Sequence, residues 1–106
     1  MATILAPFDS MPWEQGAHPL EQKKALAGRG LAILKFAPGF ADPSWCERSH
    51  VLYVLEGSLE VELADGTTTL RVGQCAELDR GTRHRVRNPG DVSVVVFVVS
   101  DRDGPG

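Results

Sequence analysis

Three side chains that can bind a transition metal or move a proton fall within five residues of the sequence. Cys46, Glu47 and His50 bring a thiol, a carboxylate and an imidazole together just ahead of an apolar run. Such groups are ligands for zinc, iron, nickel and copper. A flat strand would separate Cys46 from His50 by about 13 Å, because each residue advances the chain by about 3.3 Å. Cys46 and His50 can therefore share an ion only if the chain bends between them.

A second imidazole, His84, lies much further along the chain in an Arg-His-Arg-Val-Arg run. Alternate side chains of a strand point to opposite faces, so His84 and Val86 share one face and the three arginines the other. Since Val86 is a core residue type, we expect His84 to point inward. The arginines then form an outer stripe, solvated or paired with Glu60 and Glu62. His50 and His84 belong to different strands and are free to converge on one site.

The residues around these imidazoles predict the walls of a pocket. If His50 points inward, Leu52 does so as well, and Val86 accompanies His84. Trp45 is expected to form a wall or lid over the mouth of the pocket. Glu47 has the opposite parity to Cys46 and is expected at the surface.

Short strands must position these groups. From Leu31 onward, apolar or alternating runs are separated by glycine, proline, aspartate and asparagine, and Asp65-Gly66 is a strong hairpin turn. The expected strands are 31–36, 50–55, 58–63, 67–72, 75–78, 83–87 and 92–99. This spacing predicts one all-β domain, an antiparallel sandwich or barrel.

The N-terminal part is less regular. We expect residues 1–30 to form an arm that packs on the barrel or on a partner, residues 31–100 to form the barrel, and residues 101–106 to form a flexible tail. Residues 20–27 fit a short helix or an edge strand paired with the next run, and the strand is slightly favoured. His18, beside a proline, is expected to be exposed.

Composition limits the partners. The chain has 106 residues and a net charge of −3, so it lacks the basic surface that nucleic acids or anionic membranes attract. No apolar run approaches the roughly 20 residues of a membrane helix. Residues 1–13 contain no lysine or arginine and do not resemble a signal peptide, and two cysteines are too few for a disulfide scaffold. A cytoplasmic protein is expected.

Two strands also predict self-association. Residues 51–55 are apolar on both faces, and residues 94–99 are apolar throughout. A second sheet can cover one face, but the other needs the N-terminal arm or a second copy of the chain. We therefore expect a homodimer.

The segment Gly73–Asn88 resembles the second sequence motif of the cupin family. That motif reads glycine, five residues, proline, one, glycine, two, histidine, three, asparagine. Every spacing is present, and Asp79 alone replaces the usual proline. His50–Gly57 is similar to the end of the first cupin motif, in which six residues lie between an acidic residue and the closing glycine. The resemblance covers about residues 31–99 and implies an antiparallel jelly-roll barrel, also called a double-stranded β-helix.

The departures from the family pattern bear on the site. His50 stands where the family has a glutamate, and Cys46 and Ser44 stand where it has two histidines, so His84 alone keeps the usual ligand identity. The chain is similar to a small subgroup of single-domain cupins with a Trp-Cys…His…Tyr-Val-Leu-Glu-Gly pattern. The resemblance implies a divalent transition metal (Zn, Fe, Ni or Mn) held by His50, His84 and Cys46.

Three functions fit these residues. The first is a metal-dependent enzyme acting on a small molecule, of dioxygenase, isomerase or lyase type. The second is a metal-free module that binds a small ligand in the barrel. The third is a structural dimer with a degenerate site. The fold hosts many chemistries, so it does not name the substrate or the reaction.

Overall fold

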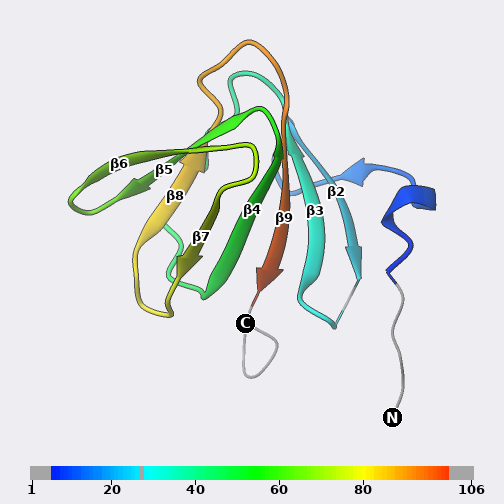
Figure 1. Ribbon diagram of the computed structural model, residues 1–106, viewed down its shortest axis with the longest axis horizontal. Helices are drawn as coiled ribbons and strands as arrows, with labels where there is room; N and C mark the ends of the chain where they lie inside the picture. Colours follow the sequence, from blue (N-terminus) through cyan, green and yellow to red (C-terminus); the bar gives the residue numbers. More distant parts are fainter. Residues whose placement is uncertain (1–5, 27, 101–106) are drawn as a thin grey trace.

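Two antiparallel sheets pack face to face in the computed structural model, which describes residues 6–26 and 28–100 (Figure 1). The larger sheet has the strand order β1-β2-β3-β9-β4-β7, and the smaller has the order β6-β5-β8. A 3-10 turn, η1 (Phe8–Ser10), precedes the strands. The strands are β1 (Glu14–Gln15), β2 (Glu21–Leu26), β3 (Leu31–Phe36), β4 (His50–Glu56), β5 (Ser58–Leu63), β6 (Gly66–Arg71), β7 (Cys75–Leu78), β8 (His84–Arg87) and β9 (Val94–Ser100).

The seven strands predicted from the sequence are all present, with ends that shift by one or two residues. The ambiguous stretch 20–27 contains the strand β2, which pairs with β3 from Glu21↔Phe36 to Leu26↔Leu31. The N-terminal strands β1 and β2 thereby extend the larger sheet at one edge. The predicted tail, 101–106, lies outside the described residues. Across residues 6–26 and 28–100, no helix is long and apolar enough to cross a membrane.

The core lies between the sheets and follows the predicted alternation. Val54 on β4, Val96 on β9, and Leu59 and Val61 on β5 are at most 1% exposed. Burying each such side chain contributes roughly 1.5–3 kcal/mol relative to leaving it in water. These residues hold the two sheets together. The first residues of β4 and β8 are the polar residues His50 and His84, whose side chains point inward beside this core.

The N-terminal segment covers part of the outer face of the larger sheet. The Phe8 ring meets the Phe97 ring edge-on, with 6.3 Å between centroids. The ammonium groups of Lys24 and Lys35 lie 4.7 and 4.6 Å from the centroid of the Trp13 ring, close enough for cation–π attraction. Part of the outer apolar surface is therefore covered from within the chain.

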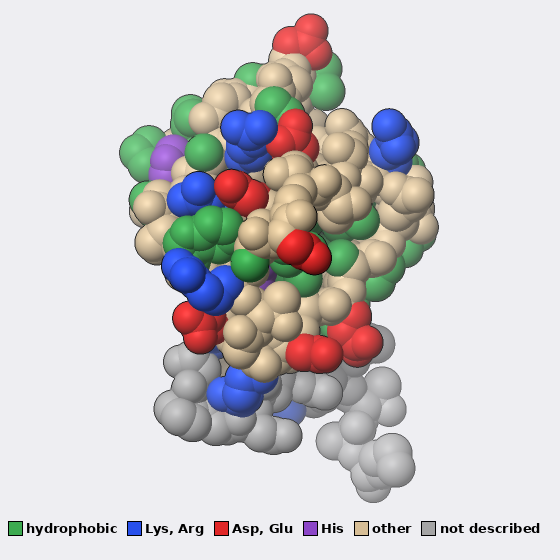
Figure 2. All heavy atoms as spheres, turned by 90° about the vertical axis from the view of Figure 1, so that its left-hand side faces the viewer, with side chains coloured by type: hydrophobic (Ala, Val, Ile, Leu, Met, Phe, Trp, Pro, Cys, Tyr) green, Lys and Arg blue, Asp and Glu red, His purple; other side chains and the backbone are tan. Residues whose placement is uncertain are grey.

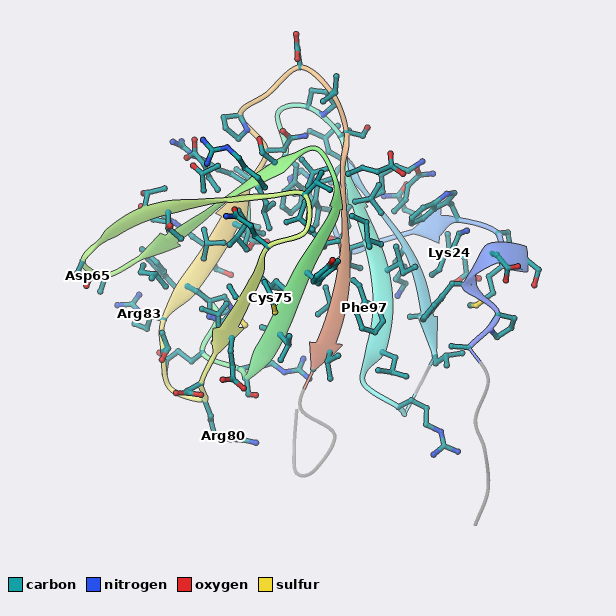
Figure 3. All side chains as sticks on the ribbon, in the orientation of Figure 1. Lys24, Asp65, Cys75, Arg80, Arg83 and Phe97 are labelled. Atoms are coloured by element: carbon teal, nitrogen blue, oxygen red, sulfur yellow. The ribbon has the colours of Figure 1, made fainter. Side chains whose placement is uncertain are left out.

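The outer face of β4 is less covered. Tyr53 is 40% and Leu55 39% exposed, and Cys75, which pairs with Tyr53, lies on the same side of the sheet as Phe97 (Figure 3). The expected homodimer stays a prediction for this face, and light scattering at micromolar concentration checks it. A monomer would refute it.

The turn between β4 and β5 depends on Gly57. Its φ is +76°, and a Cβ there would lie 2.8 Å from the backbone oxygen of Ser93. Gly73 has a similar φ of +86° with nothing within 4 Å of the same position. In both alanine variants the left-handed conformation should lower the free energy of unfolding by about 1 kcal/mol. In Gly57→Ala the clash with Ser93 should lower it by about 2 kcal/mol more. Urea denaturation of the two variants measures the difference, and equal losses would contradict it.

Candidate metal centre

A pocket of about 490 Å³ opens between the two sheets. All six side chains that the sequence nominated for the site line this pocket: Cys46, His50, His84, Trp45, Leu52 and Val86. The alternation predicted for the two histidine strands is observed, because Leu52, His84 and Val86 are at most 9% exposed. The sequence-based candidates therefore meet at one cavity.

The chain between Cys46 and His50 does bend. Cys46 pairs with His84 as an isolated antiparallel bridge, in which each backbone N–H donates to the carbonyl oxygen of the other residue at 2.8 and 2.9 Å. His50 instead begins β4 in the other sheet. This turn brings Cys46 Sγ to 3.5 Å from His50 Nε2, in place of the 13 Å of a flat strand.

The two imidazoles are oriented by bonds to their outer nitrogens. His84 Nδ1 donates to the carbonyl oxygen of Thr82 at 2.9 Å, so the lone pair of this ring is on Nε2. His50 Nδ1 lies 3.1 Å from Ser100 Oγ, and in the tautomer protonated at Nδ1 the lone pair of this ring is on Nε2, the nitrogen that faces Cys46 Sγ. Such outer partners fix the orientation of metal-binding histidines. The ring centroids are 5.2 Å apart at an angle of 83°.

The donor atoms of the triad fit a transition metal. One ligand atom from each of Cys46, His50 and His84 lies within 4.8 Å of the others, and ligands of a tetrahedral ion at about 2.0–2.3 Å are roughly 3.5 Å apart. His84 is 3% exposed, and within the described chain no hydrogen bond occupies its Nε2. A buried nitrogen lone pair is unfavourable unless a hydrogen-bond donor or a metal ion binds it.

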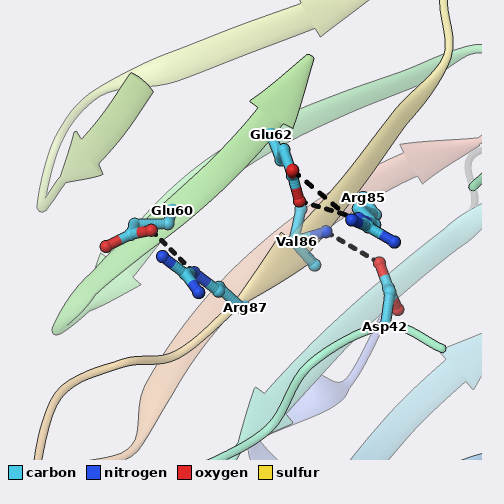
Figure 4. Close-up of polar contacts among 6 residues, drawn as sticks. All are labelled: Asp42, Glu60, Glu62, Arg85, Val86 and Arg87. Carbon is cyan, nitrogen blue, oxygen red and sulfur yellow. Dashed lines mark hydrogen bonds and ion pairs between the residues drawn. The ribbon is translucent and has the colours of Figure 1, made fainter. Parts of the chain in front are cut away.

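The outer arginine stripe is paired as predicted. Arg85 Nε donates to Glu62 at 2.7 Å and Arg87 Nε to Glu60 at 2.8 Å (Figure 4). The hydrogen bond with Arg85 lowers the pKa of Glu62, and the same bond raises the pKa of Arg85. Basic and acidic side chains alternate over this side of the molecule (Figure 2), so it presents no large basic patch.

Two of these arginines also contact Trp45, the predicted pocket wall. The sequence did not indicate this contact. The guanidinium carbons of Arg83 and Arg85 lie 5.0 and 4.3 Å from the Trp45 ring centroid. Because Arg85 is held by Glu62, it holds the indole in place from outside. Trp45 is therefore a fixed wall of the pocket.

Other predictions had mixed outcomes. Glu47 is exposed and lies 3.9 Å from Arg83, as its parity predicted. The prediction for His18 was wrong: it is half-buried, because its ring packs edge-on against Phe40 at 4.8 Å and its Nδ1 accepts the backbone N–H of Leu20. Cys46 and Cys75 are both free thiols.

Two acidic pocket residues were missed by the sequence-based reasoning. Glu21 of β2 and Asp42, which precedes Cys46 by four residues, both line the cavity. Burial raises the pKa of Asp42, against the lowering effect of the Val86 N–H that its Oδ2 accepts at 2.8 Å (Figure 4). Burial also raises the pKa of Glu21, and repulsion from Asp42 raises it further. Strand alternation could have nominated Glu21, whereas Asp42 lies in an irregular segment without a pattern.

The raised pKa of Asp42 predicts a pH dependence of stability. A carboxyl whose folded pKa exceeds its unfolded pKa stabilises the fold below the unfolded value, and this contribution is lost as pH rises through the folded value. The ionised carboxylate thus opposes folding at neutral pH. Asp42→Asn keeps an oxygen acceptor for Val86, so it should raise Tm at pH 7 relative to wild type, with the gain disappearing toward pH 4. Thermal melts across this range check the sign, and a gain that grows on acidification would contradict it.

Comparison with known proteins agrees with this architecture. A model of the cupin domain family, Cupin_2, matches residues 32–100. Protein SchB of Streptomyces halstedii is 33% identical over 63 residues, which are 59% of this chain and 46% of SchB. The match thus spans about half the length of that curated relative.

Solved structures show the same fold. KdgF from Halomonas sp. superposes with a TM-score of 0.73 at 25% identity, over 90% of this chain and 92% of KdgF. A sugar phosphate isomerase of the cupin superfamily from Silicibacter pomeroyi gives 0.76 at 19% identity, over 94% and 76% of the two chains, and this likeness shows the fold alone. With its paired sheets, inward histidines and family match over most of its length, the chain belongs to the cupin domain family.

Proposed function

We propose that this cupin binds a divalent transition metal through Cys46, His50 and His84 and uses the centre to hold and activate a small molecule. One observation carries the proposal: a thiol and two imidazoles, from segments far apart in sequence, face one another within 4.8 Å in a pocket. Thiolate and imidazole donors favour zinc, iron or nickel over manganese, which prefers oxygen ligands.

The arrangement of the chain suits a catalytic centre better than a structural one. Structural zinc sites use four protein ligands, whereas three protein ligands leave a coordination position for water or substrate. A metal bound here would supply Lewis acidity toward an oxygen-bearing substrate. The protein itself contributes the oriented imidazoles, the Trp45 wall and a pocket large enough for a small molecule. Chemistry of isomerase, lyase or dioxygenase type is the corresponding enzymatic proposal.

Elemental analysis of the untagged protein tests the proposal. We expect close to one equivalent of zinc, iron or nickel per chain after purification, or after reconstitution of chelator-treated protein with each metal. Retention through gel filtration distinguishes the site from loose surface binding. Protein that contains no transition metal and binds none on reconstitution would overturn the proposal. A co-purifying organic ligand in that metal-free barrel would support the alternative, a binding or accessory cupin.

A further inference from the structure

The pocket contains a second polar region, formed by the carboxyl groups of Glu21 and Asp42. Asp42 Oδ2 accepts the backbone N–H of Val86 at 2.8 Å, and the backbone at His18 acts to lower the pKa of Glu21. Both side chains are partly buried. Two acidic groups thus line the same cavity as the Cys46, His50 and His84 triad.

These two carboxyl groups are in an unfavourable environment without a ligand. Burial raises the pKa of both, and the charge of Asp42 adds to the effect on Glu21. Lys23 and His18 act on Glu21 in the opposite sense, and His84, His18 and Arg85 act so on Asp42, yet the pKa of each carboxyl stays raised. A cation that entered the pocket would remove the repulsion and compensate the lost hydration.

The remaining walls define the rest of the ligand. The buried Nε2 of His84 has no hydrogen bond from the described chain and faces the same cavity, which indicates that the cavity is built to receive a guest. The rest of the lining is largely apolar and includes Leu34, Phe36, Trp45 and Val98. The exposed charges at the rim, Glu47 and Arg48, have opposite signs and give no net preference.

We propose that the pocket takes a small organic cation, an amine with an apolar aliphatic or aromatic body, whose ammonium group lies between Glu21 and Asp42. This inference rests on the proposed function, because it assigns the ligand class of the same pocket. The apolar body would lie against Phe36 and Trp45 and extend toward the metal centre. The two carboxylates, and not the metal, would select for positive charge.

Calorimetric titration with three probes of similar size tests this ligand class. The probes are 2-phenylethylamine, 2-phenylethanol and 3-phenylpropionate, which share an aromatic body and differ in charge. At pH 7 we expect the zinc-loaded protein to bind the amine at least tenfold more tightly than the alcohol, and the carboxylate least. The double variant Glu21→Gln/Asp42→Asn should bind amine and alcohol within about twofold of each other. Glu47→Gln, which removes an exposed carboxylate at the rim, should keep the preference.

A metal-free arm separates this inference from the proposed function. Amines can also bind metals directly, so the titrations are repeated on chelator-treated protein, where the amine preference should persist. The inference is overturned if the alcohol or carboxylate binds as tightly as the amine, if the preference survives in the double variant or disappears with the metal, or if the amine does not bind at millimolar concentration. The zinc content of each variant is measured separately and reports only on the metal centre.

Discussion

A His84→Ala variant should lose the transition metal that wild-type protein retains, with the apparent affinity weakened by about 100-fold or more. Removing a single outer hydrogen-bond partner of a metal ligand costs about 10–100-fold, and His84 is itself one of only three donors. Its Nε2 is buried, so bulk water cannot easily replace it. Metal content by mass spectrometry and zinc affinity by competition with a chelator measure the loss.

Two further variants make this result specific. His18→Ala also deletes a partly buried imidazole, but His18 does not line the pocket, so metal binding should be unchanged. Cys46→Ser should abolish the sulfur-to-metal charge-transfer band of the cobalt-substituted protein while the histidines still bind weakly. Circular dichroism confirms that each variant is folded. Stoichiometric metal in folded His84→Ala protein would refute the assignment of His84 as a ligand.

An Asn88→Ala variant should unfold at much lower urea concentration, with a loss of about 3–5 kcal/mol. Asn88 is 1% exposed, and its Nδ2 donates to the carbonyl oxygens of Phe36 and Val92 at 3.0 and 2.8 Å. Its Oδ1 accepts the N–H of Gly90 at 3.0 Å. Alanine removes all three bonds: the buried carbonyl of Phe36 is left unsatisfied at a cost of about 1–3 kcal/mol, and the bonds to the exposed residues Val92 and Gly90 are lost at about 1 kcal/mol each.

The neighbouring residue supplies the control for this loss. Arg87 is paired with Glu60 at the surface, and Arg87→Ala should cost at most about 1 kcal/mol, as exposed ion pairs do. Urea denaturation with an unchanged m-value reports the two free energies, and Tm should fall by roughly 15–25 °C for Asn88→Ala. If both variants are equally stable, the side chain of Asn88 does not hold the β3 end to the β8–β9 loop.

Asn88 and His84, both from the second cupin motif, differ in how their polar atoms are bonded. His84 and Asn88 are both nearly fully buried polar residues on or next to β8. Asn88 satisfies each of its polar atoms with backbone groups, whereas His84 uses only Nδ1 in this way. A buried residue with complete hydrogen bonding stabilises the fold, and one with an open lone pair is available for a ligand.

Local sequence was sufficient for the strands and for the direction of most side chains. The Arg-His-Arg-Val-Arg run placed His84 and Val86 inward because strand geometry alternates whatever lies nearby. Glycines at tight turns marked the strand ends in the same local way, and the cupin resemblance followed from these spacings. The all-β class, the seven strands of the barrel and the six nominated pocket residues could be obtained with these rules and that resemblance alone. Whether Cys46 could lie near His50 depended on a bend that these rules do not predict.

Tertiary structure alone decided which of these residues meet. The bend at Cys46 is made by its backbone pairing with His84, 38 positions further along the chain, which no local pattern specifies. Ser100 reaches His50 because β4 and β9 pair in register within the larger sheet. Asp42 reaches the pocket because its backbone N–H donates to the carbonyl oxygen of Val86, far along the chain. Alternation fixes the face on which a side chain lies, but the distance between two faces depends on non-local pairing and packing, and that pairing builds the site.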